Sequence, residues 1–140
     1  MELKIKKLHS DAKMPSYAHH GDAGFDLYAI ESVTIPVGGR VLVGTGIAME
    51  IPDGYVGLIW DKSGLAVNHG LKTLGGVIDA GYRGEIKVGV VNLSDEDYTI
   101  TVGHKVAQML IQKVEHAEIK EVTELSDTAR GHKGFGSTGK

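Results

Sequence analysis

The sequence contains no cysteine, so this chain can form neither a disulfide framework nor a thiolate metal site. It also has no apolar run approaching the roughly 18 residues that a membrane-spanning helix needs. The first residues lack the apolar core of a signal peptide. We therefore expect a soluble, cytoplasmic protein with no membrane partner.

An excess of positive charge is missing as well. The chain has 18 acidic residues against 15 lysines and arginines, which gives a formal net charge of −3. This balance offers no broad basic surface for duplex nucleic acid, so we expect no direct nucleic-acid partner. Any polyanionic ligand should be small and bound by a local cluster of residues.

What is present indicates one all-β domain. A chain of 140 residues can bury a core of its own without cross-links. Short apolar runs alternate with turn signals, and residues 33–60 contain three strand-like runs separated by Pro36–Gly39 and Pro52–Gly54. No window in residues 33–60 shows the 3.6-residue periodicity of a long helix.

Residues 75–92 are predicted to form a hairpin, with a strand, a tight turn and a second strand. Asp79 lies where the first strand ends, and Tyr82 and Arg83 follow at once. An acid at the mouth of a rigid hairpin can position a water molecule against an anionic substrate. The alternative is a surface turn with an acidic corner.

Three other polar positions allow a similar choice. Asp26, inside a short apolar strand, either faces solvent or binds a hydrated divalent cation. Residues 62–64 open a short helical turn that is either a phosphate seat or an exposed turn. Gln108, inside an apolar run, has either a role in a site or a strand-edge position bonded to backbone.

The C-terminal segment has little to bury. From Arg130 onward only Phe135 is large and apolar, while glycines and the hydroxyls of Ser137 and Thr138 dominate. This composition is typical of a loop that wraps an anion and is mobile without it. We therefore divide the chain into a body, residues 1–129, and a flexible arm, residues 130–140.

Five short stretches, AGFDLYA, KSGLA, GVIDAGYRG, GHKVAQ and RGHKGFGSTG, occur in this order across nearly the whole chain. Together they closely resemble the five motifs of the trimeric dUTPase family, the deoxyuridine triphosphate nucleotidohydrolases. The resemblance implies a β jelly roll in residues 1–129 and a homotrimer with active sites at the subunit interfaces. It also implies that the arm of each chain closes over a neighbour's site.

The reaction implied by the resemblance is hydrolysis of dUTP to dUMP and pyrophosphate with Mg²⁺. It would keep uracil out of DNA and supply dUMP for thymidylate synthesis. Asp79 would be the general base for the attacking water, and Gln108 would hold that water or an α-phosphate oxygen. Tyr82 would pack on the deoxyribose and exclude UTP, and Asp26 would contact Mg²⁺ through water.

The resemblance also carries over a set of substrate contacts. The backbone of residues 74–77 would recognise the uracil edge, and Phe135 would stack on uracil. The γ-phosphate would be held by Arg130 and by the hydroxyls of Ser137 and Thr138. The substrate-binding set is Lys62, Ser63, Gly64, Thr73, Gly76, Val77, Tyr82, Lys87, Arg130, Phe135, Gly136, Ser137 and Thr138.

Several positions depart from the family's usual pattern. Lys62 and Lys105 stand where arginine is usual, so a point charge replaces a bidentate fork. Lys133 replaces a usual glycine, and Thr73 lies where some members have asparagine. Asp61 occupies a position where proline is common, and we expect it to pair with a nearby cation.

Three alternatives remain. The related dCTP deaminases need a glutamate in the pocket, and Glu85 is the only acid of the predicted hairpin after Asp79. A nucleotide-binding trimer without hydrolysis would need no water-activating acid. A purely structural trimer would leave the composition of the arm unexplained.

Overall fold

The computed structural model describes residues 1–139, and these residues form eleven β-strands and one short α-helix. The elements are β1 (Lys4–Lys7), β2 (Phe25–Tyr28), β3 (Val33–Ile35), β4 (Arg40–Gly44), β5 (Ile47–Glu50), β6 (Tyr55–Trp60), α1 (Ser63–His69), β7 (Leu71–Leu74), β8 (Val77–Ile78), β9 (Lys87–Asn92), β10 (Tyr98–Ile100) and β11 (Lys105–Lys113). The prediction of an all-β fold is confirmed.

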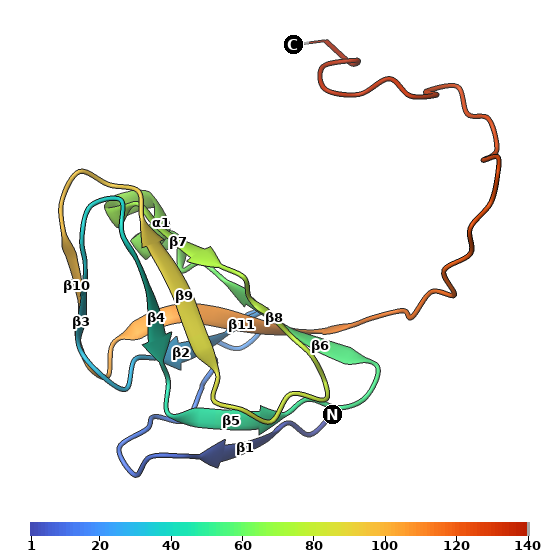
Figure 1. Cartoon of the computed structure of the whole chain (residues 1–140). Coiled ribbons are helices and arrows are strands. Elements are labelled where there is room, and N and C mark those ends of the chain that lie inside the picture. The colour runs from blue at the N-terminus through green and yellow to red at the C-terminus, as the bar shows by residue number, and fades with distance from the viewer. Residues whose placement is uncertain (140) are drawn as a thin grey trace.

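The strands form four antiparallel sheets (Figure 1). The largest has the order β2-β11-β6-β8, and a second has the order β4-β9-β7. Two further pairs, β1 with β5 and β3 with β10, lie at the lower and left margins of the view in Figure 1. The C-terminal strand β11 is therefore an inner strand of the largest sheet.

The hairpin predicted for residues 75–92 is wrong, because its two strands belong to different sheets. β8 pairs with β6, whereas β9 lies between β4 and β7. Ile86 decides this path: its side chain is fully buried, and its backbone N–H donates to Ile47 O at 2.8 Å. The segment between β8 and β9 is thus tied to the body instead of folding back on β8.

The region of residues 33–60 contains four strands, not the three predicted. The middle run breaks after β4, where Gly46 has a left-handed φ of 69° and the Thr45 hydroxyl donates to Ile86 O at 2.5 Å. This break lets β4 pair with β9 and β5 pair with β1. Periodicity indicated one long strand here because the apolar pattern continues across the break.

The core contains side chains from both larger sheets in one continuous cluster. Leu27 and Met109 come from the β2-β11-β6-β8 sheet, and Val43 and Val88 from the β4-β9-β7 sheet; all four are fully buried. Burial of such a side chain stabilises the fold by about 1.5–3 kcal/mol. The core therefore fixes the two sheets relative to each other.

Asn92 is a buried polar residue whose amide is fully used. Its Nδ2 donates to Ile35 O at 3.0 Å and Glu96 O at 2.7 Å, and its Oδ1 accepts from the backbone N–H and hydroxyl of Ser94. Burying a polar group is costly unless it is hydrogen-bonded, and here it is. Asn92 thereby joins the end of β9 to β3 and to the turn at Ser94 and Glu96.

The short helical turn expected after Lys62 is confirmed as α1. The helix ends at Gly70, whose left-handed φ of 65° lets its N–H donate back to Ala66 O. A Cβ at Gly70 would lie 2.9 Å from Ser94 N, so glycine is required there on two counts. Among residues 1–139 no helix is long and apolar enough to cross a membrane.

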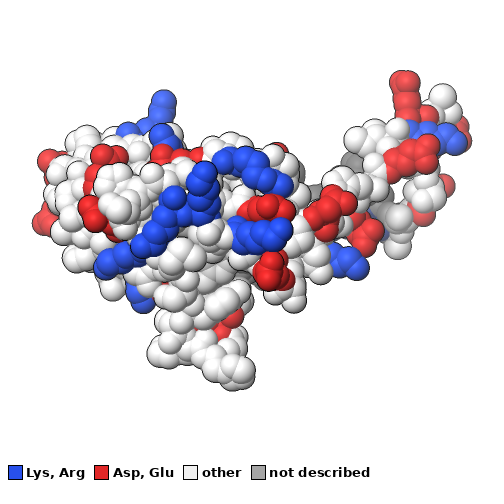
Figure 2. All heavy atoms as spheres, turned by 90° about the horizontal axis from the view of Figure 1, so that it is seen from below, with Lys and Arg blue, Asp and Glu red and all other residues white. Residues whose placement is uncertain are grey.

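Basic side chains gather on one face, which Figure 2 shows as a stripe of lysine and arginine interrupted by acidic groups. On the β1–β5 pair, Lys4, Lys6 and Arg83 line a cavity of about 340 Å³ together with Glu50. Glu50 and Lys4 form an exposed ion pair at 3.4 Å. None of the predicted site residues lines this cavity.

Beyond β11 the chain has no helix or strand through residue 139, and it leaves the body as a long arc (Figure 1). Regular structure thus ends at Lys113. The division of the chain at residue 130 stays a prediction.

Candidate functional site

One group of predicted site residues meets at an end of the largest sheet. Asp26 of β2 lies opposite Gln108 of β11, which lies opposite Trp60 of β6. α1 begins at Ser63, shortly after Trp60. The strand register therefore brings Asp26, Gln108 and residues 61–64 together.

Asp26 is buried and held between two ammonium groups. Lys62 Nζ donates to Oδ1 at 2.5 Å, and Lys105 Nζ lies 2.7 Å from Oδ2, which receives no well-directed hydrogen bond. Burial by itself raises the pKa of Asp26, but the two lysines outweigh it and leave that pKa below its ordinary value. The interpretation of Asp26 as a solvent-facing strand residue is wrong, because the side chain is only 3% exposed.

Gln108 lies on an inner strand, so the strand-edge interpretation is wrong, although its amide does bond to backbone. Its Nε2 donates to Asp61 O at 2.9 Å. Its Oε1 lies against the buried Gly24, where an added Cβ would come within 2.7 Å of that oxygen. Gly24 therefore provides the space in which the Gln108 amide lies.

Replacing Gly24 by alanine should displace the Gln108 amide, weaken its hydrogen bond to Asp61 O and destabilise the protein by about 1 kcal/mol. Equilibrium urea unfolding measures the change. Gly81→Ala is the matched control, since its Cβ would meet open space. Equal stability of the two variants would contradict the close approach of Gly24 and Gln108.

A second group of predicted residues surrounds a cavity of about 250 Å³ beside β6, β7 and β8. Thr73, Gly76 and Val77 line it, with Trp60 and Lys72 among their neighbours. Gly76 has φ 100°, and an added Cβ would lie 2.8 Å from Ile59 O. The backbone of Gly76 is hydrogen-bonded to β6 through Ile59 N at 2.8 Å, so this cavity wall is fixed.

Asp79 follows β8 directly, as predicted, and is exposed. The Tyr82 ring lies over Gly84, and its hydroxyl donates to Glu85 O at 3.0 Å. Glu85 itself accepts from Gly46 N at 2.9 Å and pairs with Lys87 at 3.6 Å. Glu85 thus has a structural partner, which speaks against the pocket glutamate that deamination would need.

Asp79 does not meet the group of Asp26, Gln108 and residues 61–64 within one chain. Ile78 lies opposite Gly57, three residues along β6 from Trp60, which lies opposite Gln108. Asp79 continues away from that end, so it lies more than roughly 10 Å from Gln108 along the strands. The residues of the arm form a third group that extends away from both (Figure 1).

The arm residues occupy exposed positions. Phe135 is fully exposed, with a left-handed φ of 43°. Arg130 Nε donates to Lys133 O at 2.8 Å. Gly136, Ser137 and Thr138 are exposed as well. A single chain therefore assembles the first two groups of predicted site residues, whereas Asp79 and the arm lie apart from the first group.

Sequence reasoning missed Trp60 and assigned no role to Lys105. Trp60 is half exposed and lines both the 250 Å³ cavity and a hollow of about 520 Å³ bordered by Ser63 and Gln108. Its position as the single tryptophan, at a strand end next to KSGLA, was the available signal. The expected cation partner of Asp61 is Lys72, at 3.0 Å.

The dUTPase family model matches residues 10–139. The chain belongs to the dUTPase family. It is 50% identical over 141 residues to the deoxyuridine 5'-triphosphate nucleotidohydrolase of Clostridium kluyveri, covering 99% of each chain. It is 53% identical over 142 residues to that of Nautilia profundicola, covering 100% of each. Membership of this family makes the chain a nucleotidohydrolase.

Solved dUTPase structures share the fold. The Staphylococcus bacteriophage 80alpha dUTPase with dUpNHpp has a TM-score of 0.93 at 31% identity, over 99% of both chains. A mutant dUTPase of phage phi11 of S. aureus has a TM-score of 0.82 at 30% identity, over 89% of this chain and 98% of that one. That phage protein coordinates a structural Mg(II) ion. The predicted jelly-roll-like fold is therefore confirmed.

Proposed function

We propose that this chain hydrolyses dUTP to dUMP and pyrophosphate, in a trimer whose sites combine residues of different chains. The observation that carries the proposal is the cluster of Lys62, Asp26 and Gln108 at one sheet end, in a chain that matches the dUTPase family along its length. The dUTP-like ligand of the phage relative supports the same substrate.

The phosphate side of the site is formed by β2, β11 and the start of α1. Lys62 and Lys105 supply positive charge, and their shared partner Asp26 fixes both ammonium groups. Ser63 borders the adjacent hollow with Gln108. Phosphoryl transfer depends mainly on positioning and charge neutralisation, which such a cluster provides.

The reaction needs a base for the attacking water. Asp79 accepts a proton from the attacking water, and the water oxygen bonds to the α-phosphorus. At the same time the bond from that phosphorus to the bridging oxygen breaks, and pyrophosphate leaves. Gln108 holds the water or an α-phosphate oxygen. The exposed position of Asp79 after a short, paired strand suits this role.

The separation of the groups favours a site shared among subunits. Asp79 of one chain lies too far from Gln108 of the same chain to act on the same phosphorus. A second copy could bring its Asp79 to the phosphate cluster, which is the group of Lys62, Asp26 and Gln108. The arm of a third copy could cover this cluster and Asp79. A trimer would also give the exposed Phe135 a uracil ring to stack on, while Arg130, Ser137 and Thr138 hold the γ-phosphate.

Mg²⁺ fits this chain as a phosphate-borne ion. No group of three potential side-chain ligands exists in residues 1–139, and both Asp26 oxygens face lysines. Asp26 would therefore contact the ion through water, as Mg²⁺ bound to phosphates commonly retains its waters. Mg²⁺ would neutralise charge on the triphosphate.

The 250 Å³ cavity is the candidate binding site for the uracil ring. Its walls include the backbone of Gly75 and Gly76 and the side chain of Val77. Fixed backbone groups can read the uracil edge while leaving little room for a thymine methyl. Tyr82 and Lys87 would complete substrate binding, with Tyr82 against the deoxyribose.

The test is pyrophosphate release from dUTP with Mg²⁺, beside UTP, dTTP and dCTP. Release selective for dUTP supports the proposal. No release from dUTP would refute it, and ammonia release from dCTP would favour deamination. Release from all four nucleotides would support the chemistry and contradict the proposed pocket.

Lys62→Ala should lower kcat/KM for dUTP about 10- to 100-fold, mainly through KM, because a charged contact to phosphate is lost. Lys62→Arg should restore most of this loss. Lys113→Ala is the matched control, because Lys113 lies at the opposite end of β11. An unchanged kcat/KM in Lys62→Ala would refute the phosphate role.

A further inference from the structure

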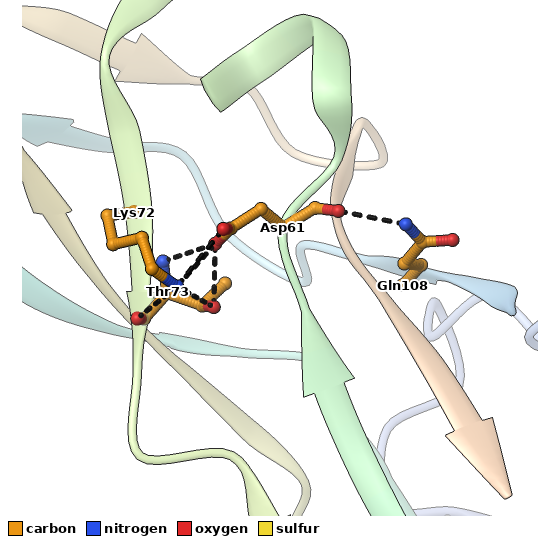
Figure 3. Close-up of polar contacts among 4 residues, drawn as sticks. All are labelled: Asp61, Lys72, Thr73 and Gln108. Atoms are coloured by element: carbon orange, nitrogen blue, oxygen red, sulfur yellow. Dashed lines mark hydrogen bonds and ion pairs between the residues drawn. The ribbon is translucent and has the colours of Figure 1, made fainter. Parts of the chain in front are cut away.

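Asp61 contacts two segments with different proposed tasks (Figure 3). Its backbone oxygen accepts from Gln108 Nε2 at 2.9 Å. Its carboxylate Oδ1 accepts from both the backbone N–H and the hydroxyl of Thr73, each at 2.7 Å. One residue thus joins the phosphate side of the site to β7.

Lys72 completes the cluster. Its Nζ lies 3.0 Å from Asp61 Oδ2 and 3.2 Å from Oδ1, and it also donates to Thr73 O at 3.2 Å. Burial raises the pKa of Asp61, but the hydrogen bonds of Thr73 and the Lys72 cation outweigh it and leave that pKa below its ordinary value. Asp61 is therefore ionised at neutral pH, as its three donors require.

The cluster lies between the two cavities. Lys72 and Thr73 line the 250 Å³ cavity, and Asp61 and Gln108 line the 520 Å³ hollow. Trp60, the residue before Asp61, lines both. Any movement of Asp61 would change a wall of each cavity.

We propose that Asp61 is a positioning residue that couples the wall of the uracil cavity to the orientation of Gln108 in the same chain. This inference rests on the proposed hydrolysis of dUTP. Without the negative charge of the carboxylate, the hydrogen bonds from the Thr73 N–H and the Lys72 ammonium weaken, and the wall of the uracil cavity loosens. The Asp61 carbonyl, which orients the Gln108 amide, is then less well fixed.

The expected effect is loss of base selectivity with a smaller loss of turnover. In Asp61→Asn, KM for dUTP should rise about 10-fold, and the dUTP-over-dCTP ratio of kcat/KM should fall about 10-fold. Thr73→Val removes the hydroxyl from the other side of the contact and should act in the same direction. Asp53→Asn is the matched control, since Asp53 precedes the opposite end of β6 and should leave all constants unchanged.

A double-mutant cycle separates positioning from general destabilisation. Asp61→Asn and Thr73→Val should be non-additive in the selectivity ratio, because both weaken the same contact. Asp61→Asn and Asp53→Asn should be additive. If Asp61→Asn does not fold, Thr73→Val still tests the shared hydrogen bond.

The single tryptophan provides a readout that does not require turnover. Trp60 lines both cavities, so its fluorescence should report binding of dUpNHpp, with a Kd about 10-fold weaker in Asp61→Asn. If Asp61→Asn and Thr73→Val lower only the melting temperature, with Kd and selectivity unchanged, the proposal is overturned. Wild-type binding without turnover would refute the proposed hydrolysis, and the shift in Kd would then decide the role of Asp61. Absence of both binding and turnover would overturn both proposals.

Discussion

Replacing Asp79 by asparagine is expected to lower kcat for dUTP by about 10²–10⁴-fold, the usual contribution of a general base. KM should change little, because asparagine preserves the shape of the side chain. Folding should be unaffected, since Asp79 is exposed and its carboxylate bonds to no other residue within 1–139. Steady-state pyrophosphate release and the melting temperature measure the two effects.

Asp95→Asn is the matched control, because Asp95 is an exposed acid in the turn after β9. Its kcat should equal that of the wild type. Retention of more than a third of wild-type kcat in Asp79→Asn would rule out Asp79 as the base and direct attention to other acids near the phosphate cluster.

Removing residues 130–140 should lower kcat/KM for dUTP by about 10²–10³-fold. The arm would supply charge-assisted hydrogen bonds from Arg130 and stacking from Phe135, each worth about 1–3 kcal/mol. The melting temperature should be nearly unchanged, because residues 130–139 contribute nothing to the core. A large drop in melting temperature would mean that the arm has a structural role instead.

Refolding two different inactive variants together tests whether one active site combines residues of several chains. Asp79→Asn protein and truncated protein, each nearly inactive, should regain activity when refolded together, because mixed trimers of the proposed kind would contain sites with an intact Asp79 and an intact arm. Separately refolded samples combined without exchange are the control. No recovery of activity in the mixed sample would indicate that Asp79 and the arm of one site come from the same chain.

Local patterns in the sequence predicted where helices and strands lie better than they predicted which strands pair. The start of α1 after Lys62 and the position of Asp79 at a strand end follow from local signals, and both are confirmed. The pairing of β8 with β6 does not follow from local signals. Alternation of apolar and polar residues shows which residues face the core, but it does not show which strand lies alongside. The burial of Ile86 and its backbone hydrogen bond to Ile47 decided that question.

The same limit applies to the site. The motifs drew attention to Asp26, Gln108 and Lys62, which the strand register and an ion pair bring together. The sequence could not show that Lys105 shares the Asp26 carboxylate, or that Asp61 holds Thr73. Such contacts depend on side-chain reach between strands distant in sequence, which no short-range pattern encodes.

The inner position of β11 has a consequence for biosynthesis. β2 and β6 flank β11, yet both are translated long before it. Until residues 105–113 leave the ribosome, those strands have unpaired edges that invite aggregation. A message truncated before this point would thus yield a chain unable to close its largest sheet, and folding should complete only near the end of translation.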